Sequence, residues 1–139
     1  MKIYYREKSG GIEILRCFGI EGRVEIPGMI DDKLVISAAP YAFSSHMDEK
    51  EDLKNASLWE VSDGLEFGRE EHVLAGNDVE EIVFPYTLKE IGRYIFYGCG
   101  NLKKLEFSDS LMQIGCGAFT GCHALEKLTV HMEQGKKSG

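Results

Sequence analysis

Two stretches near the C-terminus have the same sequence pattern, and this repeat constrains the fold more than any other feature of the chain. Residues 91–107 and 114–130 align without a gap when one is shifted by 23 positions. Apolar, glycine and cysteine positions coincide in this alignment: Leu88/Leu111, Ile91/Ile114, Phe96/Phe119, Leu102/Leu125, Leu105/Leu128, Gly92/Gly115, Gly98/Gly121 and Cys99/Cys122. A repeat of this length indicates a solenoid of stacked coils. A solenoid presents a surface without a built-in pocket, which favours a binding role.

Each copy contains the spacing Leu-x-x-Leu-x-apolar, which predicts a short strand with alternate side chains directed inward. The spacing occurs at Leu102–Phe107 and Leu125–Val130, and one coil earlier at Val79–Phe84. With a period of about 20–29 residues, it is typical of leucine-rich repeats. We therefore expect a mostly β (or α+β) repeat fold, a short right-handed leucine-rich repeat solenoid of about four coils with an N-terminal β-hairpin cap.

The chain of 139 residues is expected to form a single domain. Two alternating segments flank Ser9-Gly10-Gly11, so residues 1–22 are predicted to form a β-hairpin that caps the open end of the solenoid. Four further parts are expected: residues 23–52 as the first coil with an acidic loop, 53–78 as a degenerate coil or an insertion turning at Asp63-Gly64, 79–130 as two regular repeats plus a last strand, and 131–139 as a flexible tail.

The chain has four cysteines, Cys17, Cys99, Cys116 and Cys122. Cys99 and Cys122 hold the same repeat position, so we predict free thiols stacked in the core, where cysteine behaves as a small apolar residue. A disulfide between them is the alternative in an oxidising compartment. Cys116 lies outside this column and is predicted to be exposed, which makes a thiol-reactive protein using Cys116 a remote alternative function.

The overall charge and hydropathy exclude several classes of partner. The net charge is −7, from 16 basic and 23 acidic residues, which argues against binding to nucleic acid or to anionic membrane surfaces. No apolar run reaches the roughly 20 residues that a membrane helix needs, so no membrane insertion is expected. The segment Met1–Lys8 lacks the apolar region of a signal peptide. We therefore expect a cytoplasmic protein, or a surface-exposed or secreted one if a leader has been removed.

The sequence contains no recognisable catalytic, cofactor or metal motif. It has neither His-Glu-x-x-His nor Gly-x-Ser-x-Gly. The glycines of 115–121 follow the repeat rather than a phosphate-binding loop. Cys116, Cys122 and His123 lack the second ligand pair of a zinc site, and the acidic run Asp48–Asp52 lacks the ligand spacing of a calcium loop. We predict that the protein is not an enzyme and has no catalytic residues, no cofactor and no metal.

The strand register predicts two rows of outward side chains across neighbouring coils. The first row contains Arg23, Glu81, Lys104 and Lys127, and the second contains Glu25, Val83, Glu106 and Thr129. Opposite charges at Glu81 and Lys104 would face each other, whereas Lys104 and Lys127 would meet as like charges. The rows are either an ordinary solvated sheet face or a protein-binding surface, because solenoids bind partners along such surfaces.

The repeated pattern at Ile91–Phe107 and Ile114–Val130 resembles BspA-like (Treponema-type) leucine-rich repeats. The N-terminal part is similar to the lead-in of bacterial members of that family, at Tyr4-Tyr5, Ile26-Pro27 and Tyr41-Ala42-Phe43. The resemblance covers about residues 2–130. It implies a bacterial protein of a family whose members are often surface-attached and implicated in adhesion or protein–protein contact. We therefore expect a non-enzymatic protein–protein interaction module with an unknown partner.

The C-terminal end of the predicted solenoid has no obvious cover. After the strand at Leu125–Val130 the sequence offers a short polar segment and no further apolar coil. An uncovered edge strand is a template for pairing with another chain. We expect either a two-fold homodimer through this edge strand or a natural protein that continues beyond residue 139. The homodimer makes a structural self-assembling unit the runner-up function.

Overall fold

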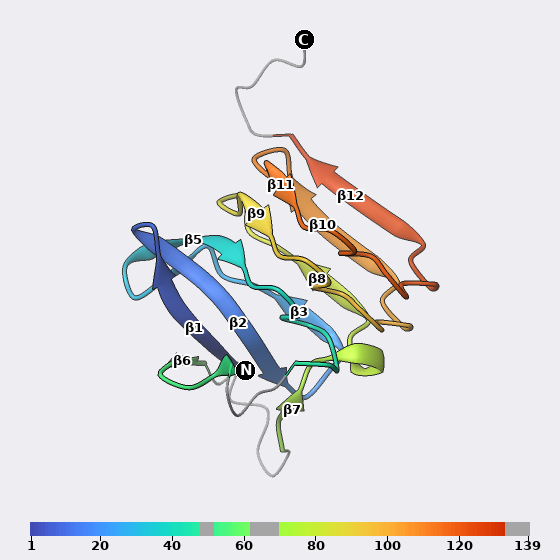
Figure 1. Ribbon diagram of the computed structural model, residues 1–139, viewed down its shortest axis with the longest axis horizontal. Helices are drawn as coiled ribbons and strands as arrows, with labels where there is room; N and C mark the ends of the chain where they lie inside the picture. The colour runs from blue at the N-terminus through green and yellow to red at the C-terminus, as the bar shows by residue number, and fades with distance from the viewer. Residues whose placement is uncertain (48–51, 62–69, 133–139) are drawn as a thin grey trace.

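The computed structural model describes residues 1–47, 52–61 and 70–132. Within these residues the chain consists almost entirely of strands and turns, with the short 3-10 helix η1 (Gly76–Asp78). The strands form two sheets that share the apolar core (Figure 1). This arrangement confirms the predicted solenoid of short strands. The described parts of the chain contain no helix of the length and apolarity required to cross a bilayer.

One sheet contains one strand from each coil, in the spatial order β12-β10-β8-β3. Its strands are β3 (Arg23–Glu25), β8 (Glu81–Val83), β10 (Lys104–Ser108) and β12 (Lys127–His131). All neighbours are parallel because each coil returns the chain to the same face. Val24, Ile82 and Leu105 occupy one inward column and are fully buried. The alternation read from the sequence therefore sets the core side of this sheet.

The second sheet has the order β11-β9-β5-β2-β1-β6, with β4 paired to β5 and β7 paired to β2. Its strands are β1 (Lys2–Lys8), β2 (Gly11–Gly19), β4 (Met29–Ile30), β5 (Lys33–Ala38), β6 (Ser57–Glu60), β7 (His72–Val73), β9 (Glu90–Ile91) and β11 (Gln113–Ile114). The pair β1 and β2 is an antiparallel hairpin, and β2 runs parallel to β5. The hairpin thus continues the sheet of the coils and covers the N-terminal end of the core.

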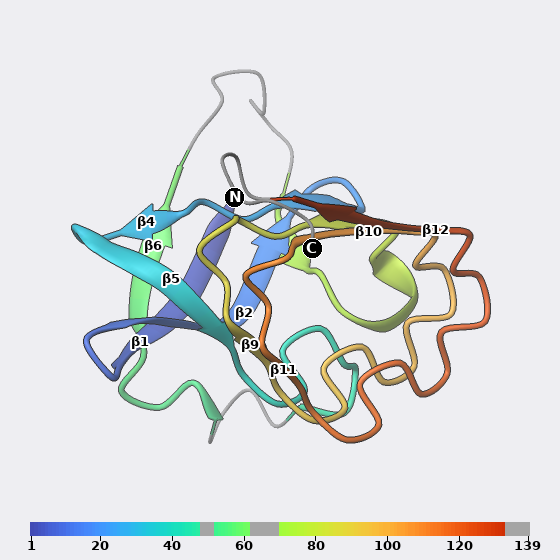
Figure 2. The same cartoon turned by 90° about the horizontal axis from the view of Figure 1, so that it is seen from above.

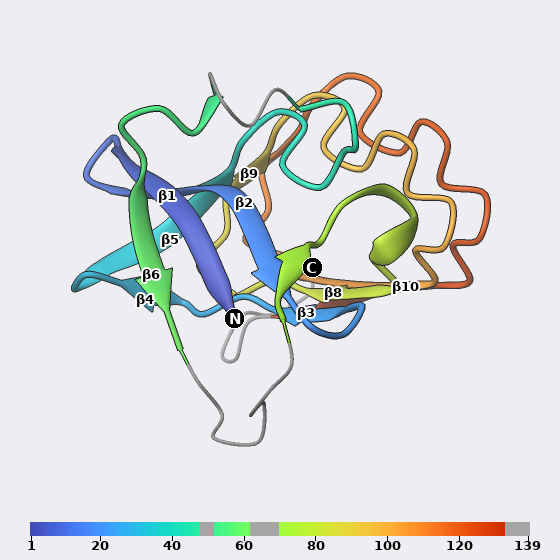
Figure 3. The same ribbon diagram turned by 90° about the horizontal axis from the view of Figure 1, so that it is seen from below.

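The coil interpretation of residues 53–78 is wrong for the described part of that segment. Strand β3 pairs directly with β8, so no coil stands between them. Strand β6 instead pairs antiparallel with β1, and β7 pairs antiparallel with β2 (Figure 3). The segment is therefore an insertion that extends the hairpin sheet. The predicted acidic run at 48–51, the turn at Asp63-Gly64 and the tail from residue 133 lie outside the described residues.

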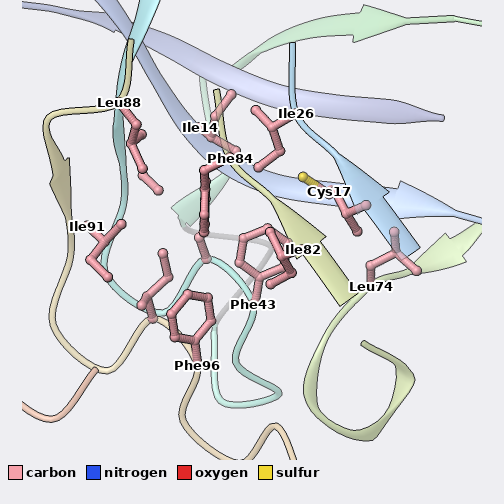
Figure 4. Packing of buried hydrophobic residues seen from close by; sticks show 14 of the residues in the cluster. Ile14, Cys17, Ile26, Phe43, Leu74, Ile82, Phe84, Leu88, Ile91 and Phe96 are labelled. Carbon is pink, nitrogen blue, oxygen red and sulfur yellow. The ribbon is translucent and has the colours of Figure 1, made fainter. Parts of the chain in front are cut away.

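Aromatic rings from successive coils form a ladder in the core (Figure 4). The ring of Phe96 lies 6.1 Å from Phe43 and 5.6 Å from Phe119, measured between centroids. Phe84 packs against both Phe43 and Phe96 at 6.2 Å. Burying one such ring contributes about 2–3 kcal/mol by area. The repeated phenylalanine is thus a main source of stability between the coils.

Two glycines allow the coils to approach each other closely. A Cβ atom on Gly92 would lie 2.3 Å from the backbone nitrogen of Pro40 in the preceding coil. A Cβ atom on Gly115 would lie 2.2 Å from the backbone nitrogen of Arg93. Both distances are below any real carbon contact, so only glycine fits. The repeat of this glycine is explained by backbone packing.

The two cysteines of the repeat are free and make the same contact one coil apart. The Cys99 thiol donates to the carbonyl of Phe43 at 3.3 Å, and the Cys122 thiol donates to the carbonyl of Phe96 at 3.4 Å. Cys99 is buried and Cys122 half-buried. Burial raises the pKa of the Cys99 thiol to about 12. The prediction of free core thiols holds, and no disulfide joins them.

Candidate functional site

The structure places the eight predicted surface residues in two rows, in the predicted register. Across β3, β8, β10 and β12 the first row is Arg23, Glu81, Lys104 and Lys127. The second row is Glu25, Val83, Glu106 and Thr129. We call these eight residues the strand face. It is continuous because every strand that carries it pairs with the next in parallel register.

At the β3 end, the one cation of the strand face is paired with two carboxylates. The Arg23 guanidinium contacts the carboxylate of Glu25 at 3.2 Å and that of Glu81 at 3.4 Å. The hydrogen bond to Glu25, together with the charges of Glu81 and Glu106, raises the pKa of Arg23. Glu81 faces Lys104 in the register, yet its carboxylate lies against Arg23. Half of the strand face is therefore occupied by its own ion pairs.

At the β12 end, two lysines of the strand face lie side by side. Lys104 and Lys127 are exposed and are direct neighbours in the ladder. Lys103 is exposed beside them. Within the described residues none of the three forms an ion pair, while Glu106 is engaged by the Nε2 atom of His131 at 3.2 Å. This half of the strand face is positive on a chain whose net charge is −7.

The end of the solenoid beside β12 exposes apolar side chains. The exposed fractions of Leu128 and Val130 are 53% and 52%, although their counterparts Leu105 and Phe107 in β10 are buried. The residues that share this exposure are Met112, Ile114, Leu128, Val130 and Met132, which we call the open end. The sequence predicts the free edge of the last strand but not that Met112 and Ile114 belong to the same patch. β11 and β12 are the edge strands of the two sheets, and this arrangement places both groups at the same end of the solenoid.

The residues considered for chemistry do not assemble into a site. Cys116 is exposed, as predicted, and in the described ranges no hydrogen bond joins its thiol to a base. Those same ranges contain no group of three or more His, Cys, Asp or Glu side chains that could hold a metal ion.

Residues 70–137 match the sequence model of a protein family described as a BspA type leucine rich repeat region. The chain carries a leucine-rich repeat region of the BspA type. The glycines, phenylalanines and cysteines described above recur at equivalent positions of successive coils. Leucine-rich repeat proteins mediate protein interactions and are generally not enzymes.

Two solved structures share the fold of this leucine-rich repeat chain. A leucine rich repeat protein of Treponema pallidum has a TM-score of 0.65 and 23% identity, covering 91% of this chain and 46% of its own. A leucine rich cell surface protein of Faecalibacterium prausnitzii has a TM-score of 0.59 and 18% identity, covering 91% of this chain and 30% of its own. The chain thus spans less than half the length of either. No protein of curated function matches the sequence.

Proposed function

We propose that the chain is a non-enzymatic protein–protein interaction module and that the strand face binds the partner. The observation that carries this proposal is the row of lysines at the β12 end of the face. Lys104 and Lys127 meet as like charges across neighbouring strands, which is unfavourable in isolation. An anionic partner surface would relieve that repulsion, and complementary charge gives specificity and a fast association rate. The partner should therefore present carboxylates to this face.

Charge reversal on the strand face tests this proposal. Immobilised wild-type protein and a Lys104→Glu/Lys127→Glu variant would be used to capture proteins from cytosolic and surface fractions. A Lys54→Glu/Lys89→Glu variant carries the same change of charge on exposed lysines outside the strand face and serves as the control.

The decisive result is a protein that wild type and the control retain and the strand-face variant loses. Purified, that protein should bind more weakly as salt is raised, because exposed charges are screened within about 8 Å at physiological ionic strength. Equal capture by all three baits would show that the strand face is only solvated.

A second candidate function, structural self-assembly, is favoured by the open end. Leu128 and Val130 expose apolar area that the same positions bury elsewhere in the stack. The backbone N–H of Lys127 points to β10, so by alternation those of Leu128 and Val130 point to the outer edge. Pairing of two β12 strands would give the two-fold homodimer.

Sedimentation equilibrium measures this assembly directly. A homodimer should show a mass that rises with concentration, and Val130→Pro should abolish the rise by removing an edge donor. Val130→Thr keeps the donor and separates the backbone from the side chain. A constant monomer mass at high concentration would contradict self-assembly through β12.

The thiol-reactive alternative rests on Cys116 alone, since burial raises the pKa of Cys17 and Cys99 to about 12. Native protein should react with a thiol reagent mainly at Cys116, and Cys116→Ser should abolish the fast phase. A rate no higher than that of an unfolded cysteine peptide would identify Cys116 as an ordinary surface thiol.

We also propose a cytoplasmic location, which the free cysteines support because reducing compartments keep thiols unpaired. A surface location is the alternative. Fractionation of cells followed by immunodetection distinguishes the two compartments.

A further inference from the structure

Three turns, one from each of three coils, stack along the side of the solenoid away from the strand face (Figure 2). The backbone N–H of Tyr41 donates to the carbonyl of Arg93 at 3.2 Å, and that of Tyr94 donates to the carbonyl of Cys116 at 3.1 Å. Tyr41, Tyr94 and Gly117 therefore occupy one equivalent position. All three have positive φ angles, of 61°, 52° and 69°.

A positive φ is easy for glycine and unfavourable for a tyrosine. The coil that contains Gly117 meets the requirement with the residue that fits it. The two preceding coils place large aromatic residues there instead. Backbone strain of this kind persists where the surrounding structure holds the residue in place, and strained residues cluster at ligand-binding sites. The strain therefore indicates a role for the two tyrosine rings.

The rings form a compact aromatic group at the surface, which we call the aromatic shelf: Tyr41, His46, Tyr94 and Tyr97. Tyr41 and Tyr94 are stacked with centroids 5.6 Å apart. Tyr97 meets Tyr94 edge-on at 6.0 Å and His46 edge-on at 4.8 Å. The three tyrosines are half-buried and His46 is exposed. Each ring thus keeps an edge or a face available to a ligand.

Contacts from the core hold the shelf in place. The buried guanidinium of Arg16 donates to the carbonyl of Tyr41 and to that of Ala42, both at 3.1 Å. The ring of Tyr94 covers Gly117 so closely that a Cβ atom there would lie 2.3 Å from it. These contacts restrict the backbone at Tyr41 and the ring of Tyr94, and such preorganisation lowers the entropy cost of binding.

The shelf lines a hollow of about 460 Å³ formed by its four residues. A second hollow of about 390 Å³ shares Tyr41 and His46 and adds two cations, Arg6 and Arg93, and one carboxylate, Asp52. Arg6 is paired with Glu13 at 2.6 Å. Arg93 is exposed, and no ion pair with a described carboxylate engages it. An aromatic surface thus adjoins a cation that is available to an anionic group.

We propose that the aromatic shelf binds an extended, proline-containing acidic segment of a partner protein. Such segments adopt the polyproline II helix, whose prolines dock on grooves lined by aromatic rings. The backbone carbonyls of that helix are unpaired, so they can accept hydrogen bonds from tyrosine hydroxyls. An acidic side chain of the segment would reach Arg93, where a charge-assisted hydrogen bond forms.

This site lies on the turns and shares no residue with the strand face. The inference is therefore independent of the proposed function. The variants that test the two surfaces do not overlap. A negative result for the strand face therefore does not contradict binding at the aromatic shelf, and a negative result for the shelf does not contradict binding at the strand face.

The chain supplies a matched variant for the test. One coil later, Gly117 stands at the position of Tyr94 and Thr120 at that of Tyr97. The variant Tyr94→Gly/Tyr97→Thr therefore gives one turn the residues that the next turn already has. It removes the shelf and relieves the strained φ, so it should fold. Tyr86→Ala removes a tyrosine with an exposed fraction of 68% away from the shelf and is the control.

The probe is a fluorescein-labelled peptide of sequence Pro-Pro-Glu-Pro-Pro-Glu-Pro-Pro, with binding measured by fluorescence polarisation. We expect Tyr94→Gly/Tyr97→Thr to weaken binding about tenfold or more, as loss of aromatic anchors does. Arg93→Ala should weaken it several-fold and reduce its salt dependence. Tyr86→Ala should bind as wild type does. Peptides with alanine for proline, or lysine for glutamate, should bind at least tenfold more weakly.

Four outcomes would overturn the proposal: no binding of the proline peptide at millimolar protein, equal binding by the double variant, equal binding of the alanine peptide, or equal binding of the lysine peptide. Saturable binding of oligosaccharides without any of the proline peptide would assign the shelf to a different ligand. Circular dichroism of each variant shows whether it is folded. If the double variant unfolds, Arg93→Ala and the peptide series still decide the question.

Discussion

The inner coils of the solenoid and its last described coil contain the same repeat, yet they bury it very differently. Ile82 and Leu105 are 0% exposed, whereas Leu128, one coil further, is 53% exposed. Phe96 is likewise 0% exposed, while Phe119 is only partly buried. The side chains are of the same kind and the strand register is the same. Within the described residues, Leu105 and Phe96 are covered by a following coil, and Leu128 and Phe119 are not. The contribution of a repeat residue therefore depends on its neighbours more than on its identity.

The N-terminal end is closed by polar contacts as well as by apolar burial. The Glu13 side chain on β2 is 2% exposed and accepts from Arg6 at 2.6 Å and Lys8 at 3.1 Å. The hydroxyl of Ser37 on β5 also donates to it, at 3.0 Å. A buried carboxylate is tolerated because these donors satisfy it. The hairpin is thus fastened to the coils, while the described residues add no comparable cover at the open end.

Removing the repeated phenylalanine from a closed and an open position should give the largest difference. Phe96→Ala leaves a cavity among Phe43, Phe84 and Phe119 and should cost about 3–5 kcal/mol. Phe119→Ala should cost about half as much, because solvent already reaches that ring. Urea unfolding followed by circular dichroism measures both. Equal losses would show that the last coil is as well packed as the middle one.

The leucine column gives the same comparison with less apolar area. Leu105→Ala removes a fully buried side chain in β10 and should cost about 2–4 kcal/mol. Leu128→Ala removes a half-exposed side chain in β12 and should cost less than about 1 kcal/mol. The two substitutions are chemically identical. A cost at Leu128 that approaches that at Leu105 would mean that β12 is covered in solution, and its concentration dependence would identify self-assembly as the cause.

The glycine positions show whether the coils at the open end can move apart. Gly92→Ala forces a carbon against the backbone of Pro40 between two enclosed coils and should cost about 1–3 kcal/mol. Gly115→Ala makes an equally close contact with the backbone of Arg93. Among the described residues no further coil packs against the coil of Gly115, so that coil can shift outward. The loss of stability should therefore be smaller than for Gly92→Ala. The reverse order in thermal unfolding would contradict an open, compliant end.

The regular part of the fold could be read from the sequence because its information is periodic. The spacing of Leu105 and Leu128 fixes the strands, and it places Lys104 beside Lys127 as observed. Residues 53–78 could not be read in this way. The spacing Leu53-x-x-Ala56-x-Leu58 imitates a repeat strand, but β6 binds the free edge of β1 instead. A short apolar pattern does not state which edge its strand will join.

The position of the strand face was predictable from the sequence, but its electrostatic detail was not. The register gave the rows of the strand face, yet the ion pair of Glu81 goes to Arg23 rather than to Lys104. That choice depends on side-chain reach and competing partners, which the register does not encode. The aromatic shelf was not foreseen, because its signal is a positive φ at Tyr41 and Tyr94. Local propensity favours the opposite sign there, so the feature exists only in the stacked structure.

The smallest expected effect concerns an ion pair at the closed end. The Lys8 ammonium lies 2.6 Å from the Glu90 carboxylate. The hydrogen bond between them lowers the pKa of Glu90 below its usual 4.5 and raises the pKa of Lys8 above its usual 10.5. The stabilisation is therefore complete between these two ordinary values. It is lost as pH falls through the lowered pKa of Glu90, and as pH rises through the raised pKa of Lys8.

Glu90→Gln should accordingly reduce stability by about 0.2–1 kcal/mol at pH 7, because both partners are partly exposed and water screens the pair. The difference from wild type should shrink as pH falls below 4.5, the ordinary pKa of the glutamate, because protonation then removes the charge of the pair. Urea unfolding at pH 3, 5, 7 and 9 measures the profile. Glu106→Gln, which removes the exposed contact with His131 near the open end, is the matched comparison and should change stability by no more than about 0.5 kcal/mol. A loss at Glu106 larger than that at Glu90 would reverse the contrast between the fastened and the open end.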